Sequence, residues 1–300
     1  MQTKRIKCSI NGVLLLDKPI GITSNAALQH AKRLYQASKA GLTGILDPLA
    51  SGLLPICFGE ATKFAQYPTD ADKCYEATIK LGITTDTGDS TGQILEQIKP
   101  TAGISDVQVA IARFIGTILQ TPPMYSALKH KGQPLYKYAR QGVEIERKAR
   151  EITIHRLTLV DFDNDILRIS VACSKGTYIR VLAEDIGRQL GCGAHLTALR
   201  RTQVGQFFLD TATTLESLES CAATDRDQLL LPVDCLVTGL PEVKLEPEEV
   251  FYFRLGQSIL NAKLEHLQRY RIYDEKHEFI GIGEADEMGK LAPKRLVVQQ

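Results

Sequence analysis

The sequence predicts an α+β fold that ends in a small β-rich module. Residues Lys73–Leu81 alternate between apolar and polar side chains, as a half-buried strand does, whereas Ser24–Tyr35 repeats its apolar residues at helical spacing. Beyond Gly239, short alternating segments follow one another between turn residues, and a module of about 60 residues is large enough to fold alone. Strands and helices mixed along one chain predict helices packed on a sheet.

The first predicted elements surround a glycine-rich stretch. Val13–Leu16 is a short aliphatic run and predicts a buried strand. Ser24 is the expected N-cap of the helix that continues to about Tyr35. Gly41–Gly59 contains four glycines and two prolines, so we expect turns there.

The next elements form a predicted hairpin and a second helix. Ile152–Asp161 and Leu167–Cys173 are predicted strands, and Asp163-Asn164-Asp165 is the turn between them. Thr177–Leu190 is a predicted helix that ends at Gly191.

The C-terminal module is predicted from three short alternating segments. They are Tyr270–Asp274, Phe279–Glu284 and Arg295–Val298. The boundary falls near Gly239-Leu240-Pro241, so residues 1–238 are expected to form one domain and residues 239–300 the module.

The composition predicts a soluble globular protein of the cytoplasm. Hydrophobic residues make up 44% and charged residues 24% of the chain, as in ordinary folded domains. No apolar run approaches the ~18 residues of a membrane span, and Val13–Leu16 stops at Asp17, short of the ~7–15 residues of a signal-peptide core. We therefore expect no membrane association.

The cysteines and acids predict no metal site. The seven cysteines are scattered without a C-x-x-C pair: Cys8, Cys57, Cys74, Cys173, Cys192, Cys221 and Cys235. Cys192 and His195 have ligand-like spacing, but no second pair stands near them, so buried thiols are the better interpretation. The polar loop Thr84–Gln93 lacks the register of a calcium loop, and its segment Asp86–Gly92 is predicted to be a turn.

The net charge of +1 is unevenly distributed. Residues 239–300 carry −2 and residues 1–238 carry +3, while Lys129–Arg150 alone has a local net charge of +5. Its basic residues are Lys129, Lys131, Lys137, Arg140, Arg147, Lys148 and Arg150. A solvated face would explain such a cluster. However, Tyr136 and Tyr138 lie within it, and cations with tyrosines between them suit a loop that grips folded RNA.

A lone acid, Asp47, stands in the apolar and glycine-rich segment Gly41–Pro55. An aspartate before a proline is commonly a turn former whose side chain bonds its own backbone. A functional interpretation needs a partner, because a buried carboxylate stays ionised only beside a cation. Arg180 is a candidate, since Ser174–Arg180 follows a predicted strand and opens a helix, a position suited to anions. An arginine on the surface of a helix start is the alternative.

Two tyrosines are candidates for contact with a nucleic-acid base. Tyr178 lies two residues before Arg180 and can face the same pocket. Tyr75 begins the alternating strand, where a tyrosine is commonly half-buried core. Its ring would equally serve as a flat platform on which a base stacks.

Together these segments resemble the TruB family of tRNA pseudouridine synthases, in order and along essentially the whole chain. The matching segments are those around Asp47, Tyr75, Tyr125 and Arg180, with Lys18-Pro19-x-Gly21 and Ala194-His195-Leu196-x-x-Leu199-Arg200-Arg201-Thr202.

The resemblance implies an enzyme that isomerises uridine 55 in the T loop of tRNA to pseudouridine, without cofactor or metal. Asp47 matches the family's catalytic aspartate and Arg180 the arginine paired with it. The residues that match positions around or supporting the uracil pocket are Tyr75, which stacks on the base, Tyr178, Leu199 and Lys63.

The resemblance also implies the architecture. It predicts a mixed, largely antiparallel sheet with surrounding helices and a central RNA-binding cleft. An RNA-clamping insertion is expected at about residues 124–150, and a PUA-like RNA-binding module at residues 239–300. The net charge of −2 on that module predicts little long-range attraction for RNA. We expect a monomer.

Leu42 departs from the family pattern. The family's Gly-His-Thr-Gly-Thr-Leu-Asp-Pro is Gly41-Leu42-Thr43-Gly44-Ile45-Leu46-Asp47-Pro48 here. The family histidine is placed to engage the flipped nucleotide, and a leucine side chain cannot hydrogen-bond. We therefore expect Leu42 to meet the substrate by apolar wedging, with altered efficiency and not with loss of activity.

The chemistry requires that the target base leave its loop, because the reacting bond is unreachable inside folded RNA. A carboxylate can then attack the sugar or ring, or stabilise charge while a glycal forms, and the sequence leaves both routes open. Tyr75 is placed to assist proton transfer, although an ordinary phenol, with a pKa of about 10, is a weak base near neutral pH.

Three other interpretations stay open. An RNA-binding or RNA-folding protein is favoured by Leu42 and opposed by the intact Asp47, Tyr75 and Arg180. A synthase for another RNA is opposed by the long basic insertion and the C-terminal module. A nucleotide-binding enzyme is remote, because neither G-x-x-x-x-G-K-[ST] nor a strand-linked G-x-G-x-x-G occurs.

Overall fold

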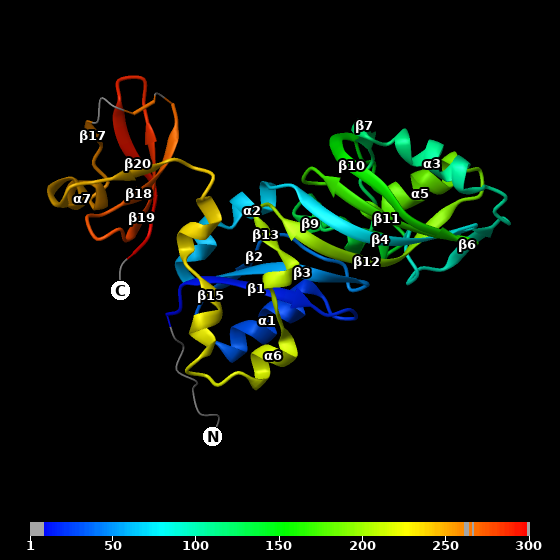
Figure 1. Ribbon diagram of the computed structural model, residues 1–300, viewed down its shortest axis with the longest axis horizontal. Coiled ribbons are helices and arrows are strands. Elements are labelled where there is room, and N and C mark those ends of the chain that lie inside the picture. Colours follow the sequence, from blue (N-terminus) through cyan, green and yellow to red (C-terminus); the bar gives the residue numbers. More distant parts are fainter. Residues whose placement is uncertain (1–8, 261–263, 266, 299–300) are drawn as a thin grey trace.

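The computed structural model describes residues 9–260, 264–265 and 267–298. In Figure 1 its elements form three parts, of which two share one long sheet and the third, C-terminal part stands at one end. Cys8 lies outside the described residues. No helix in the described ranges is long and apolar enough to cross a membrane.

One sheet of eleven strands runs through the first two parts. Its strands are β1 Gly12–Lys18, β2 Ala40–Leu42, β3 Ala50–Phe58, β4 Lys73–Leu81, β7 Gly116–Gln120, β10 Arg150–Asp163, β11 Ile166–Cys173, β12 Ala194–Val204, β13 Phe207–Phe208, β14 Thr213–Thr214 and β15 Leu230–Leu231. The central order is β14-β1-β3-β12-β4-β11-β10-β7. Only β1–β14 and β3–β12 are parallel among its described pairs, so the predicted mixed, largely antiparallel sheet is confirmed.

Helices and short turns cover this sheet. The helices are α1 Ser24–Leu34, α2 Gln66–Asp70, α3 Ile104–Ala112, α5 Ile179–Gln189 and α6 Leu215–Ser220, with the 3-10 turns η1 Gly59–Phe64, η2 Leu209–Thr211, η3 Arg226–Leu229 and η4 Val233–Val237. The alternating strand predicted at Lys73–Leu81 has those bounds, and the predicted hairpin is β10 paired antiparallel with β11. The ribbon of β5 Ile83–Thr85 and β6 Ile94–Gln97 was not predicted, nor were α3 and β7.

The turn-rich interpretation of Gly41–Gly59 is wrong for its second half, because Ala50–Phe58 is a buried strand. Gly52 permits this, since its φ is +102° and a Cβ there would stand 2.3 Å from the Arg201 carbonyl oxygen of β12. Pro55 is tolerated because β12 pairs with the strand only up to Gly52 and β2 only from Ile56. The proline therefore falls in the gap between these two partners, where a missing N–H costs no ladder bond.

The first helix begins one residue earlier than predicted. Thr23, not Ser24, is its N-cap, and the Thr23 hydroxyl accepts a hydrogen bond from the Ala26 N–H. Ser24 is instead buried, with its hydroxyl bound to the backbone of Leu46. The serine thus fixes the segment that leads to Asp47.

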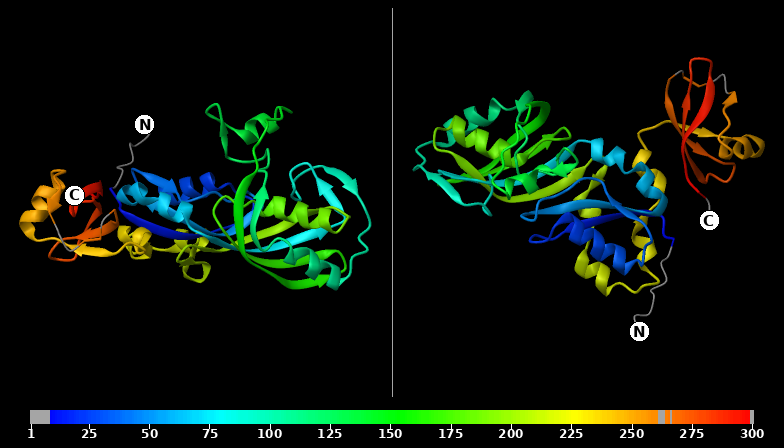
Figure 2. Two further views of the ribbon diagram at one scale, coloured as in Figure 1. Left: turned by 90° about the horizontal axis from the view of Figure 1, so that it is seen from above. Right: turned by 180° about the vertical axis from the view of Figure 1, so that it is seen from behind.

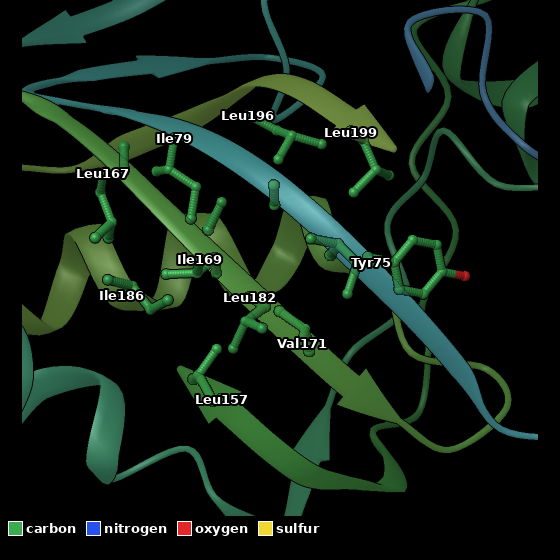
Figure 3. Close-up of a cluster of buried hydrophobic side chains, with 14 of the residues drawn as sticks. Tyr75, Ile79, Leu157, Leu167, Ile169, Val171, Leu182, Ile186, Leu196 and Leu199 are labelled. Carbon is green, nitrogen blue, oxygen red and sulfur yellow. The ribbon is translucent and has the colours of Figure 1, made fainter. Parts of the chain in front are cut away.

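The main core lies between the sheet and α5. Buried aliphatic side chains of β4, β11 and β12 pack there against Leu182 and Ile186 of the helix. Figure 3 shows Tyr75 at the edge of this cluster, with its hydroxyl directed away from the other labelled side chains. The core therefore holds the ring of Tyr75 while its polar end faces outward.

The C-terminal part has its own sheet and core. Its elements are β16 Glu242–Lys244, α7 Pro247–Arg254, β17 Ile259–Leu260, β18 Arg269–Tyr273, β19 Phe279–Ala285 and β20 Lys290–Leu296. The first two predicted strands match β18 and β19, whereas the third, predicted at Arg295–Val298, begins earlier, at Lys290. Phe279 packs against Phe64 of η1 at 5.5 Å between ring centroids, so the module is joined to the first part by an apolar contact.

The basic insertion projects from the body, as the left view of Figure 2 shows for the green segment between β7 and β10. It contains the two-residue strands β8 Lys129–His130 and β9 Gln133–Pro134 and the helix α4 Leu135–Ala139. Of the α4 side chains, Leu135 is buried, and its N–H donates to the Leu128 carbonyl.

Candidate active site

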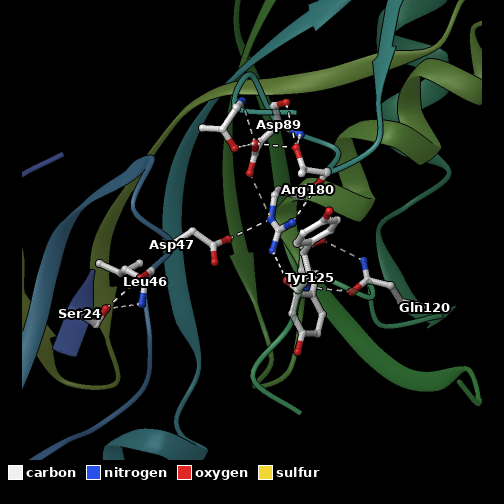
Figure 4. A network of polar contacts seen from close by, with 10 residues as sticks. Ser24, Leu46, Asp47, Asp89, Gln120, Tyr125 and Arg180 are labelled. Carbon is white, nitrogen blue, oxygen red and sulfur yellow. Dashed lines mark hydrogen bonds and ion pairs between the residues drawn. The ribbon is translucent and has the colours of Figure 1, made fainter. Parts of the chain in front are cut away.

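A buried guanidinium, that of Arg180, joins three loops at the candidate site. Its Nε donates to Asp47 Oδ2 at 2.9 Å, its Nη1 to the Thr87 carbonyl at 2.8 Å and its Nη2 to the Tyr125 carbonyl at 2.7 Å. The Arg180 side chain is 5% exposed, whereas the Asp47 side chain is 42% exposed. Figure 4 shows the two groups pointing toward each other. The predicted pairing of Asp47 with Arg180 is therefore present.

A second carboxylate, Asp89, lies on the other side of Arg180. Its Oδ2 is 3.8 Å from Arg180 Nε, and its side chain is 7% exposed. The Thr87 and Thr91 hydroxyls donate to Asp89 Oδ1 at 2.8 and 2.6 Å. The loop is a turn, as predicted, but sequence reasoning missed this acid. The two threonines that flank Asp89 were the only local signal, and hydroxyls beside an acid are common in turns.

The loop that carries Asp47 is held by hydrogen bonds to the segment before α1 and to its first residue. The Leu46 N–H donates to the Ser24 hydroxyl, and the Gly21 N–H donates to the Pro48 carbonyl at 2.7 Å. Lys18, whose side chain is fully buried, donates to the carbonyls of Pro19 and Ile22 at 2.8 Å each. Burial lowers the pKa of Lys18 to about 8, although the charge of Asp47 opposes this.

Three further predicted site residues, Tyr75, Tyr178 and Leu199, lie near this network, but none of them lines the pocket that opens beside Asp47. Tyr75 and Leu199 are both 9% exposed and belong to the same buried cluster. Tyr178 is the N-cap residue of α5, and its backbone is held by the Gln120 side chain, which accepts from its N–H at 2.8 Å and donates to its carbonyl at 3.1 Å. Burial raises the pKa values of both tyrosine hydroxyls.

A pocket of about 790 Å³ opens beside Asp47. Its walls come from the Asp47 loop, the Asp89 loop and the base of the insertion, and Arg180 is part of them. Ile45 lines the pocket and is 60% exposed, so an apolar side chain stands beside the carboxylate. A cavity of this size can receive a nucleotide.

Two predicted site residues lie elsewhere. Leu42 belongs to β2 and packs half-buried against the core cluster of α1, because its strand pairs with β3. Lys63 donates to Glu60 at 2.6 Å and to the Leu296 carbonyl of β20 at 2.8 Å. These contacts place Lys63 at the junction with the C-terminal module. Neither residue lines the pocket beside Asp47, and the predictions that Leu42 meets the substrate and that Lys63 supports the site stay predictions.

Six of the seven predicted RNA-binding cations are exposed. They are Lys129, Lys131, Lys137, Arg140, Lys148 and Arg150. Arg140 also lies over the Tyr136 ring, with 5.4 Å from its Cζ to the ring centroid. Arg147 differs, because its guanidinium donates to the carbonyls of Ile145 and Pro122 and to Glu144. Its hydrogen bonds thus hold the base of the insertion, and its predicted contact with phosphate stays a prediction.

Cys192 and His195, the pair with ligand-like spacing, each contact a backbone carbonyl. Cys192 Sγ donates to the Gly193 carbonyl, and His195 Nδ1 lies 3.0 Å from the Ile83 carbonyl oxygen. Within the described ranges, no three His, Cys, Asp or Glu side chains are grouped as a metal would require.

Comparisons with known proteins agree along the whole chain. A family model for the N-terminal domain of TruB family pseudouridylate synthases matches residues 32–179. A model for the tRNA pseudouridylate synthase B C-terminal domain matches residues 180–238, and one for the C-terminal part of pseudouridine synthase II TruB matches residues 241–297.

Individual relatives are similar over their full lengths. The tRNA pseudouridine synthase B of Methylobacillus flagellatus is 53% identical, covering 100% of this chain and 99% of its own. That of Chromobacterium violaceum is 52% identical, covering 97% of this chain and 96% of its own. Among solved structures, a chain from a crystal structure of a Cbf5-Nop10-Gar1 complex has a TM-score of 0.71 at 26% identity, covering 96% of this chain and 84% of that one.

Proposed function

This chain belongs to the TruB family of pseudouridine synthases, and on this basis we propose that Asp47 is the carboxylate with which it isomerises uridine 55 of tRNA. Relatives that match its full length are tRNA pseudouridine synthases B, so the reaction is an isomerisation of uridine to pseudouridine and the substrate is tRNA. The observation that carries the assignment is the contrast between a buried Arg180 and a half-exposed Asp47 held 2.9 Å from it. One partner supplies a fixed charge and the other remains open to the substrate.

The reaction starts when the target uridine leaves the T loop and enters the pocket, at a cost of a few kcal/mol. Asp47 then attacks the nucleoside or stabilises charge while the N1–C1′ bond breaks. Arg180 keeps the carboxylate oriented during this step through a charge-assisted hydrogen bond. The freed ring turns and rejoins the sugar through C5, and Tyr75 holds it by stacking.

The proposed tRNA contacts involve exposed residues around the pocket. The exposed cations of the insertion are placed to bind phosphates of the T stem-loop next to the pocket. Ile45, which is exposed beside Asp47, wedges against the loop that the uridine leaves. We assign residues 1–238 to catalysis and residues 239–300 to additional RNA binding. One copy suffices, because Asp47, Arg180 and Tyr75 all come from one chain.

The decisive experiment is Asp47→Asn, assayed for tRNA binding and pseudouridine formation together. We expect the Kd for tRNA to stay within about twofold and the single-turnover rate to fall by ~10³-fold or more, because a reacting group is removed. Asp210→Asn makes the same change at an exposed residue of η2 and should match the parent protein. Product formation by Asp47→Asn at the parental rate would refute the assignment.

An RNA-binding protein without chemistry is the second candidate, and the same assay separates the two. The parent protein would then bind tRNA without forming pseudouridine. Mapping the modified position tests the target, since pseudouridine at a position other than 55 would contradict it.

A further inference from the structure

A second buried guanidinium, that of Arg201, lies behind the candidate site. Arg201 is 2% exposed, and its Nε donates to the Leu53 carbonyl at 2.8 Å. Its Nη2 has no hydrogen-bond partner in the described part of the chain. Buried donors are nearly always paired, so an unpaired one calls for a functional explanation.

Arg201 is placed between Tyr75 and the Asp47 loop. It stands directly opposite Tyr75 in the antiparallel pairing of β12 with β4, and residues opposite each other in such a pair share one face of the sheet. Leu199, two residues earlier on β12, shares that face. On the other side, a Cβ added at Gly44 would stand 3.7 Å from Arg201 Nη1. The guanidinium therefore lies in contact distance of the loop that carries Asp47.

The charge of Arg201 acts on the Tyr75 hydroxyl. Burial raises the pKa of that phenol, and the positive charge of Arg201 works in the opposite direction. Lys18 is fully buried, and burial lowers its pKa. The positive charge of Arg201 lowers the pKa of Lys18 further. Both side chains therefore lie within reach of the Arg201 charge, which by itself favours an anionic Tyr75 oxygen.

We propose that Arg201 is a positioning residue that acts through Tyr75, whose phenolate it stabilises so that the Tyr75 oxygen accepts the C5 proton of the rejoined uracil. This inference rests on the proposed function. The C5–H bond breaks and its electron pair forms the C5–C6 double bond, while the N1–C6 double-bond pair returns to N1. The nitrogen takes a proton from water, and the phenol returns its proton to the hydroxide that remains.

The test compares Arg201→Gln with Arg200→Gln under single-turnover conditions. Arg200 is the next residue along β12, binds Asp17 at 2.7 Å and faces the opposite side of the strand, so it is a matched control. We expect Arg201→Gln to slow pseudouridine formation about 10-fold or more, short of the ~10²–10⁴ that a whole general base contributes. Its Kd for tRNA should change by less than about twofold, since the residue is buried.

The isotope effect at C5 distinguishes this role from a structural one. With tRNA that carries 5-deuterouridine, Arg201→Gln should show a larger primary isotope effect than the parent protein and Arg200→Gln, because C5 deprotonation has become slower. A fluorotyrosine at position 75, which is a more acidic phenol, should restore part of the rate. A slower rate without a larger isotope effect, or an unchanged rate, would overturn the proposal.

A second variant covers the case in which Arg201→Gln does not fold. Arg201→Lys keeps the buried charge but loses the planar donor group, and its isotope effect should exceed that of Arg200→Lys. An equal isotope effect in these two variants would also overturn the proposal. The proposed function is judged separately, by product formation in the parent protein and its loss in Asp47→Asn.

Discussion

The network around Arg180 and the basic insertion are adjacent but built in opposite ways. Arg180 is 5% exposed and each of its three guanidinium nitrogens has a partner. The insertion has strands of two residues, and six of its seven cations are exposed. Under the proposed function, this contrast predicts that chemistry depends on a carboxylate fixed before the substrate arrives, whereas RNA binding by the insertion depends on charge and can adapt its geometry.

The two regions are in direct contact through the Tyr125 carbonyl oxygen. The Tyr125 carbonyl, at the base of the insertion, accepts from Arg180 Nη2 at 2.7 Å. Arg147 further fixes that base through the Pro122 and Ile145 carbonyls. The base is therefore part of the rigid region, and only the outer residues of the insertion are expected to act through charge alone.

The largest effect is expected for Arg180→Met, which breaks the rigid region. The single-turnover rate should fall ~10²–10³-fold, as when one preorganised donor to a reacting group is lost. The protein should also lose about 3–5 kcal/mol of stability, because buried Asp89 is left without its cation. Rapid-quench kinetics and denaturant unfolding measure the two. Arg188→Met removes a 75% exposed arginine from the same helix, and an equal loss in this control would contradict the argument.

An intermediate effect is expected for the double variant Lys129→Gln/Lys131→Gln, which tests the charge-based region. The Kd for tRNA should rise about 10-fold, and the slope of log Kd against log salt should fall by about one for each phosphate that is no longer neutralised. The rate at saturating enzyme should stay near the parental value. Lys99→Gln/Arg113→Gln removes two exposed cations, one before and one directly after α3. If this control weakens binding equally, the insertion has no special role.

The smallest effect is expected for the pH dependence contributed by Lys18. Its pKa is about 8 in the folded protein and 10.5 ordinarily, so between these values the unfolded chain binds the extra proton. The free energy of unfolding should therefore rise with pH, by about 1 kcal/mol between pH 8 and 9. Lys18→Met should lack this increment in denaturant titrations, while Lys137→Met controls for the loss of an exposed lysine. An identical pH dependence in the parent and Lys18→Met would contradict the burial argument.

The sequence predicted those strands and turns that a pattern within one short segment is enough to specify. The alternation of Lys73–Leu81 fixes which side chains of β4 face the core, and the aspartates and asparagine at 163–165 marked the turn between β10 and β11. The buried strand Ala50–Phe58 was missed because its glycine and proline are turn residues by themselves. The proline is compatible with a strand here because it lies between the last residue of β3 that pairs with β12 and the first that pairs with β2.

The family could be identified from the chain alone, because Asp47, Tyr75 and Arg180, the residues proposed for the chemistry, lie in recognisable local segments. The three-dimensional arrangement was needed to establish that Asp89 shares Arg180 with Asp47, that Lys63 contacts the C-terminal module and that Leu42 packs against the core cluster of α1. Arg180 and Asp47 are 133 residues apart, and a side chain's partner across such a distance is set by strand order and loop packing. A local pattern predicts which face of a helix or strand a residue occupies. It carries no information about which distant segment packs against that face.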